Sequence, residues 1–136
     1  MISGEIMKKL VTIKQTQFDT NDKNILFKGY LDVDKSMTKT VLSYVEGDGV
    51  TKVNMIFEDD KMHLERHGEM TTIMHFDPQV ITEGSVISPY GTIPINIDTH
   101  KYINKDHTIA VEYDVVMEGE VSGRFRLICQ IKEVLA

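Results

Sequence analysis

Hydrophobic and polar residues alternate along almost the whole chain. The alternation is clearest over residues 93–97, 109–117 and 125–131, where every second residue is apolar. A period of two is typical of strands that bury one face, whereas an amphipathic helix repeats at about 3.6 residues. The pattern therefore predicts strands throughout. The alternating apolar positions are Val11, Ile13, Ile25, Phe27, Val53, Met55, Phe57, Met62, Leu64, Ile93, Ile95, Ile97, Ile109, Val111, Tyr113, Val115, Met117, Phe125, Leu127, Cys129 and Ile131.

Short segments rich in Gly, Pro, Asn and Asp separate these stretches. Connections this short join antiparallel neighbours, because a parallel partner needs a crossover of about a dozen residues or more. The spacing predicts an up-and-down meander of about 8–10 strands, and a sheet of that size with one apolar face tends to close or to split into two layers. Closure also removes exposed edges. We therefore expect an all-β antiparallel barrel. The turn segments are residues 21–24, 34–36, 47–49, 59–60, 68–69, 88–91, 104–106 and 118–120.

Composition points to a single globular domain. The chain has 136 residues, 41% of them hydrophobic and 26% charged, and a chain of this size buries about two-thirds of its unfolded surface. We expect one domain over residues 1–136, with residues 1–6 as a candidate disordered extension. The net charge is −6 and the basic residues are spread along the chain, so we expect neither nucleic acid nor a membrane as a partner.

The single cysteine, Cys129, cannot form an internal disulfide. That fits a reducing compartment, so we expect a cytoplasmic protein. Cys129 lies on an apolar stripe with Leu127 and Ile131, where a thiol is buried and inert. No glycine loop for a nucleotide is present, and the serine of Gly119–Gly123 is one place too late for a hydrolase elbow. We therefore expect no enzyme activity and no cofactor.

Three of the five histidines lie in one predicted hairpin, at positions 63, 67 and 75. A two-residue type II′ turn at Gly68-Glu69 places Leu64 opposite Ile73, which is the apolar match expected of an inward face. That register turns His63 and His67 outward and His75 inward, so the histidines do not share a metal ion. A three-residue loop is the alternative, and it brings His63 and His75 to one side.

Arg66 lies on the inward face of the same predicted hairpin. An unpaired guanidinium inside a barrel is costly, so Arg66 needs an acidic partner, several acceptors or an anion. The inward partners allowed by strand parity are Glu46, Tyr44, Tyr113 and Thr99. One interpretation is a self-satisfied polar network or an arginine at the barrel rim; the other is the polar floor of a ligand cavity.

Several segments resemble the uncharacterised bacterial YwiB-like family. They are residues 29–68, 88–102 and 112–133, with L-x-Y-x-E at Leu42–Glu46, R-x-G at Arg66–Gly68 and the P-Y-G that begins at Pro89, followed by Thr99, as the most specific parts. Ser88 departs mildly from the pattern, since threonine is frequent there. The resemblance implies a lipocalin-like, calycin-type barrel and no known activity.

Two functions from different classes fit these observations. The first is a non-enzymatic barrel that binds a small, partly apolar or anionic molecule in its interior, where inward aromatic and polar side chains meet. The second is an interaction or assembly module, such as a homodimer, whose outward Met70, Met74 and Ile56 form the contact. The expected ligand-binding residues are Arg66, His75, Tyr44, Glu46, Tyr113 and Phe57.

Overall fold

A computed structural model describes residues 5–133, and over this range the chain forms ten strands. Of the candidate extension over residues 1–6, residues 5 and 6 belong to the first strand, and residues 1–4 lie outside the described residues. The strands are β1 (Glu5–Gln17), β2 (Asp22–Lys35), β3 (Lys39–Val45), β4 (Lys52–Glu58), β5 (Met62–His67), β6 (Thr71–Phe76), β7 (Thr82–Ser88), β8 (Gly91–Lys105), β9 (Thr108–Met117) and β10 (Glu120–Glu133).

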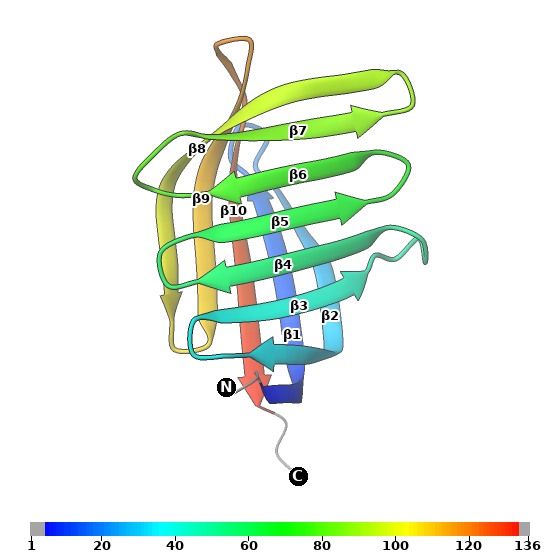
Figure 1. The fold of residues 1–136 in the computed structure, drawn as a ribbon, viewed down its shortest axis with the longest axis vertical. Coiled ribbons are helices and arrows are strands. Elements are labelled where there is room, and N and C mark those ends of the chain that lie inside the picture. The colour runs from blue at the N-terminus through cyan, green and yellow to red at the C-terminus, as the bar shows by residue number, and fades with distance from the viewer. Residues whose placement is uncertain (1–4, 134–136) are drawn as a thin grey trace.

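Each strand pairs antiparallel with its neighbours in sequence, and β1 pairs with β10 to close the barrel. The predicted closed meander is therefore confirmed. Figure 1 shows two crossed layers: β3 to β7 run across the front, together with the first part of β8 and the last part of β2, and β9, β10, β1 and the remaining parts of β8 and β2 stand behind them. Within residues 5–133 there is no long apolar helix of the kind that spans a membrane.

A β-bulge in β8 changes which residues of that strand face inward. The register with β9 shifts between Thr99 and Lys101, so His100 is the extra residue. Ile97 and Thr99 are buried before the bulge, and Tyr102 packs against the core after it. Because successive side chains alternate between faces, only an inserted residue brings both parts of this 15-residue strand onto the same interior.

The middle of the barrel is filled by its own side chains. Phe57, Phe76, Ile13 and Met55 are almost fully buried there. The ring of Tyr113 contacts Phe76 edge-on, with the ring centroids 4.7 Å apart. Phe57, Ile13 and Met55 occupy inward positions that the alternation predicted, and two hollows lie toward the two ends of the barrel.

The register of the β5–β6 hairpin corrects the two-residue turn. His67 pairs with Thr71, which leaves a loop over residues 68–70, and Leu64 pairs with Met74 instead of Ile73. This register places Phe76 opposite Met62 inside the barrel, where Phe76 is fully buried. Burying that ring outweighs a single Leu–Ile pair, since a buried aromatic side chain contributes about 2–3 kcal/mol or more.

Two orientations change with this register, and so does the reason for the glycine at position 68. His75 pairs with His63 on the outer face, so its predicted inward position is wrong. Met74 packs against the core, so its predicted outward position is also wrong and the expected contact surface loses one of its three residues. Gly68 has no positive φ. A Cβ on Gly68 would lie 2.7 Å from Thr51 Oγ1, so close packing against the β3–β4 loop is what requires glycine here.

Candidate functional site: two cavities at opposite ends of the barrel

The barrel has a hollow at each end. The β8–β9 turn lies at one end and the β9–β10 turn at the other, at the bottom and top of Figure 1. The lysine cavity, at the β8–β9 end, has a volume of about 740 Å³. The arginine cavity, toward the other end, has a volume of about 510 Å³. Both volumes fall in the range of small-molecule sites, about 300–1,000 Å³.

The arginine cavity is apolar except for a few polar side chains. Tyr44 and Tyr113 lie within it, and Glu46 and Arg66 lie at its rim. Burial raises the pKa of both phenols above the usual range for tyrosine, so they stay neutral. The lining residues are Gln15, Ile25, Leu26, Tyr44, Glu46, Gly47, Val53, Met55, Leu64, Arg66, Met74, Tyr113 and Leu127.

Arg66 forms a two-point ion pair with Glu46. Its Nε donates to Glu46 Oε2 at 3.0 Å, and its Nη2 donates to Oε1 at 2.7 Å. This is the parallel fork geometry that makes arginine–carboxylate pairs strong. The Arg66 side chain is 42% exposed, so it sits at the rim. Of the two interpretations of Arg66, the self-satisfied pair describes the geometry, and the arginine needs no external anion.

The loop that carries Glu46 is held by hydrogen bonds of its own. Asp48 Oδ1 accepts from the backbone N–H groups of Val50 and Thr51, and Asp48 Oδ2 accepts from Thr51 Oγ1 at 2.5 Å. These bonds lower the pKa of Asp48 to about 2. Thr51 in turn packs against Gly68 of the next hairpin. The segments Leu42–Glu46 and Arg66–Gly68, on which the family resemblance rests, therefore meet at this end of the barrel.

The lysine cavity runs from a buried apolar floor to a charged rim. Phe57, Ile109 and Val33 form the buried part. Four lysines line it against two aspartates, in contrast to the net charge of −6 of the whole chain. The lining residues are Met7, Lys9, Val33, Lys35, Ser36, Met37, Thr38, Lys39, Thr40, Phe57, Asp59, Asn104, Lys105, Asp106, His107, Ile109 and Ile131.

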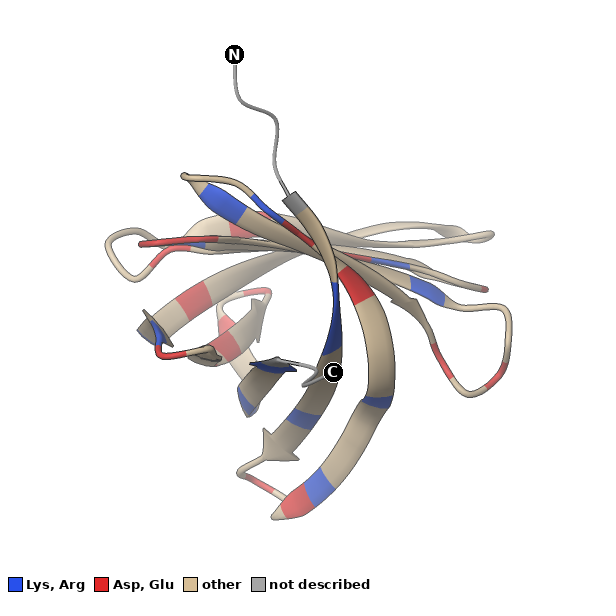
Figure 2. Ribbon diagram, turned by 90° about the horizontal axis from the view of Figure 1, so that it is seen from below, with Lys and Arg blue, Asp and Glu red and all other residues tan. Residues whose placement is uncertain are grey.

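Three of these lysines are exposed at the rim, namely Lys35, Lys39 and Lys105. Within residues 5–133, no ion pair or hydrogen bond involves their ammonium groups. Elsewhere on the side of the barrel seen in Figure 2, basic and acidic positions are interspersed along the strands and turns. Sequence reasoning missed this site, because its lysines come from four separate strands and form no run along the chain.

Hydrogen bonds across the barrel hold one wall of the lysine cavity. Tyr102 Oη donates to the backbone oxygen of Glu58 at 2.5 Å, and Asn104 Nδ2 donates to the same oxygen at 3.1 Å. Glu58 ends β4, which is separated from β8 by three intervening strands. Tyr102 reaches inward because of the bulge at His100, so that irregularity shapes the cavity.

The predicted ligand-binding residues are divided between the two ends. Tyr44, Glu46, Arg66 and Tyr113 line the arginine cavity, and Phe57 lines the lysine cavity. His75 lines neither cavity, because the register of β5 and β6 places it on the outer face. Thr99, a predicted partner of Arg66, is buried with its Oγ1 unpaired, and Arg66 bonds to Glu46 instead. Cys129 is buried among apolar side chains as expected, and burial raises the pKa of its thiol to about 12.

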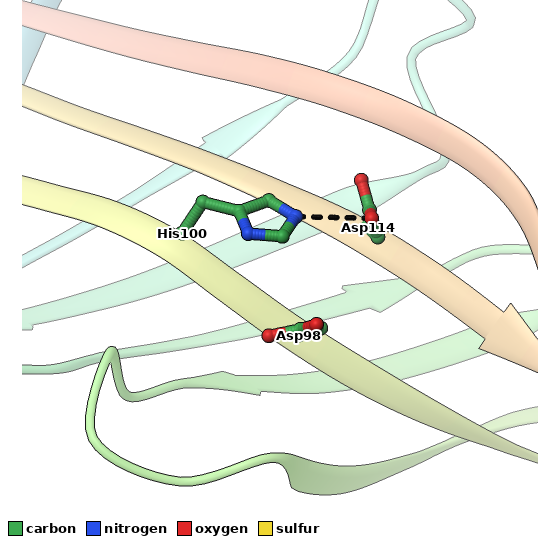
Figure 3. Close-up of side chains that lie close together, drawn as sticks. All are labelled: Asp98, His100 and Asp114. Atoms are coloured by element: carbon green, nitrogen blue, oxygen red, sulfur yellow. Dashed lines mark ion pairs between the residues drawn. The ribbon is translucent and has the colours of Figure 1, made fainter.

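A third cluster of polar side chains lies on the outer face of the barrel. Asp98, His100 and Asp114 each offer a ligand atom within 4.8 Å of the others (Figure 3). Asp114 is only 4% exposed because other side chains cover it. Arg124 bonds both of its oxygens, at 2.8 and 3.2 Å, and His100 Nε2 lies 3.0 Å from Oδ2. These bonds lower the pKa of Asp114, and its carboxylate is already neutralised by a cation.

The comparisons with known proteins agree with this fold. A family model described as a domain of unknown function (DUF1934) matches residues 9–128. The chain belongs to the DUF1934 family. A crystal structure of ywiB protein from Bacillus subtilis is similar, with a TM-score of 0.72 and 12% identity over 96% of this chain and 94% of that chain. This confirms the resemblance to the YwiB-like family and its barrel fold. No curated protein matches the sequence.

Proposed function

We propose that this DUF1934 barrel is a non-enzymatic binding protein for a small anionic amphiphile, held in the lysine cavity. One observation carries the proposal: a floor of buried apolar side chains leads to a rim where Lys35, Lys39 and Lys105 have no ion-pair partner among the described residues. An apolar tail packs against Phe57 and Ile109, and an anionic head group accepts hydrogen bonds from the ammonium groups.

The arginine cavity is less suited to an anionic head group than the lysine cavity. An anion that bound Arg66 would have to displace the two bonds from Glu46, and the displaced carboxylate would lose its partner. No such displacement is needed at Lys35, Lys39 or Lys105. The arginine cavity suits a neutral apolar group, and its ion pair maintains the rim.

The test uses laurate as the probe, with dodecanol as an uncharged molecule of the same chain length. Laurate should raise the melting temperature and appear as a one-to-one adduct in a native mass spectrum, and dodecanol should bind more weakly. The triple variant Lys35→Gln, Lys39→Gln, Lys105→Gln should lose at least about tenfold in laurate affinity, since one hydrogen bond to a charged group is worth about 1.5–3 kcal/mol.

The matched control removes the charges at the other end. Glu46→Gln combined with Arg66→Gln should leave laurate affinity unchanged. Equal binding of laurate to the triple lysine variant, or loss of binding in the control, would overturn the proposal and move the ligand to the arginine cavity or to the outer surface. A barrel that binds neither probe would also count against it.

A further inference from the structure

The outer face of the β5–β6 hairpin carries a line of four polar side chains. His63 Nδ1 lies 2.9 Å from His75 Nδ1 across the two strands. His63 Nε2 lies 3.0 Å from Glu65 Oε2, and His67 Nε2 lies 3.4 Å from Glu65 Oε1. All four face away from both cavities, so they are independent of the proposed ligand.

The contact with Glu65 determines which nitrogen of His63 carries the proton. Glu65 is a carboxylate and accepts a hydrogen bond, so Nε2 of His63 carries the hydrogen and Nδ1 presents a lone pair. That lone pair faces His75. A carboxylate that orients a histidine through its other ring nitrogen is the usual arrangement behind a histidine that binds a metal ion.

The spacing of the two nitrogens also fits one ion. Two nitrogens at about 2.0–2.1 Å from one ion lie about 2.9 Å apart at the right angle of a square-planar copper site, and about 3.3–3.4 Å apart at the tetrahedral angle of zinc, so the spacing favours copper. The ring centroids are 4.4 Å apart and the rings are tilted by 46°. Two rings that pointed nitrogen to nitrogen in a straight line would have more distant centroids, so the lone-pair directions are oblique to the line between the nitrogens.

The hairpin leaves space for the remaining ligands. The paired residues of β6 and β7 end at Ile73, and beyond them Thr82 at the start of β7 donates through its Oγ1 to the backbone oxygen of His75, so this contact leaves the His75 ring uncovered. His75 is exposed, and no described residue forms a hydrogen bond with its Nε2. The proton of His75 can therefore move from Nδ1 to Nε2, which frees a second lone pair, and water completes the coordination.

We propose that His63 and His75 bind a divalent transition-metal ion through their Nδ1 atoms, with Glu65 as the positioning residue. Imidazole ligands suit copper and zinc, and Cu²⁺ should bind more tightly than Zn²⁺ because affinity rises along the first-row series to copper. Burial, followed by the neighbouring His63, lowers the pKa of His75.

The cluster of Asp98, His100 and Asp114 is the competing site, and it supplies the control. There Arg124 already bonds both oxygens of Asp114, so an ion would have to displace a guanidinium. At His63 and His75 the ion displaces only a shared proton. The two sites differ in every ligand, which allows variants to distinguish them.

The experiment titrates the tag-free protein with Cu²⁺ and then Zn²⁺ by calorimetry, with the electron paramagnetic resonance spectrum of the bound Cu²⁺ as a second measurement. The wild-type protein should bind one Cu²⁺ with nitrogen hyperfine structure from the two imidazoles. His63→Gln and His75→Gln should each weaken binding by more than tenfold and remove that structure. His100→Gln and Asp98→Asn should leave both measurements unchanged.

Glu65 is tested by rescue. Glu65→Ala should weaken binding by about 10- to 100-fold. Glu65→Gln, whose amide oxygen still accepts from Nε2, should recover part of the loss. Circular dichroism and melting temperature check that each variant folds, which is expected because the substitutions lie on the outer face. Binding that survives His75→Gln, binding lost in His100→Gln, or no binding by the wild-type protein overturns the proposal.

Discussion

The two ends of the barrel use cationic side chains in different ways. At the arginine cavity, Arg66 is bonded at two points to Glu46, which lies on the facing loop. At the lysine cavity, three rim lysines have no partner among the described residues. The hydrogen bond that holds the wall of this cavity, from Tyr102 Oη to the backbone oxygen of Glu58, involves no cation. A cation that the fold already pairs stabilises the structure, whereas one that faces only water is available to a ligand. Four predictions compare the stability of the two ends of the barrel.

The largest effect is expected from Phe57→Ala. Phe57 is almost fully buried and forms the floor of the lysine cavity, so its loss should lower the free energy of unfolding by about 3–5 kcal/mol. Chemical denaturation measures this change. Phe57→Leu, which keeps most of the volume, should cost about 1.5 kcal/mol or less. A loss of less than about 1.5 kcal/mol in Phe57→Ala would mean that the floor of the lysine cavity is not part of the hydrophobic core.

Gly68→Ala should disturb the arginine end alone. The added Cβ would lie 2.7 Å from Thr51 Oγ1 and 3.1 Å from Thr51 Cγ2, so the β3–β4 loop must shift. We expect a loss of about 1–3 kcal/mol in the free energy of unfolding. Gly47→Ala is the matched control at the same end of the barrel, because a Cβ added there would meet nothing within 4 Å and the φ of Gly47 is not positive. Equal losses in both variants would contradict this account.

Removing one cation from each end compares them directly. Arg66→Ala leaves Glu46 half-buried without its partner, and unfolding should become easier by about 1 kcal/mol. Lys39→Ala removes an exposed cation with no ion-pair partner among the described residues and should change stability by about 0.5 kcal/mol or less. A double-mutant cycle between Arg66 and Glu46 measures their coupling. No coupling there, or a larger loss in Lys39→Ala, would remove the distinction between the two ends.

The smallest of the four effects is expected from acid pH, which should destabilise the β3–β4 loop at the arginine end. The pKa of Asp48 is lowered from 3.8 to about 2, so its contribution to stability is present above pH 4 and is lost as the pH falls toward 2. Hydrogen exchange of the Val50 and Thr51 amides, which donate to Asp48, should therefore accelerate over that range. In the Asp48→Asn variant, the exchange of these two amides should show no such acceleration between pH 4 and pH 2. Identical pH profiles for the two proteins would contradict the prediction.

Much of the fold follows from local pattern. Alternation gives each strand one apolar face, and short connections force antiparallel neighbours, so the closed meander and the inward positions of Tyr44, Phe57 and Tyr113 could be predicted. Arg66 and Glu46 could be proposed as partners because both fall on inward positions, and a buried guanidinium needs an acceptor.

The register of the histidine hairpin depends on packing beyond the turn. Two loop lengths were compatible with the residues near Gly68, and the choice between them came from burying Phe76 opposite Met62 and from the contact of Gly68 with Thr51. Both involve residues outside the turn itself. One residue of difference in the loop reverses every orientation on β6, which is why His75 and Met74 were predicted on the wrong faces.

The sequence by itself determined the strands, their order and most of their inward faces, because a period of two is a local property of the chain. Only the tertiary structure decided what meets at the ends and on the outer face: the lysines contributed by four strands, the hydrogen bonds from Tyr102 and Asn104 to Glu58 next to the bulge at His100, and the pairing of His63 with His75. These contacts depend on loop lengths, bulges and closure, which act between strands and leave no repeating signal within one.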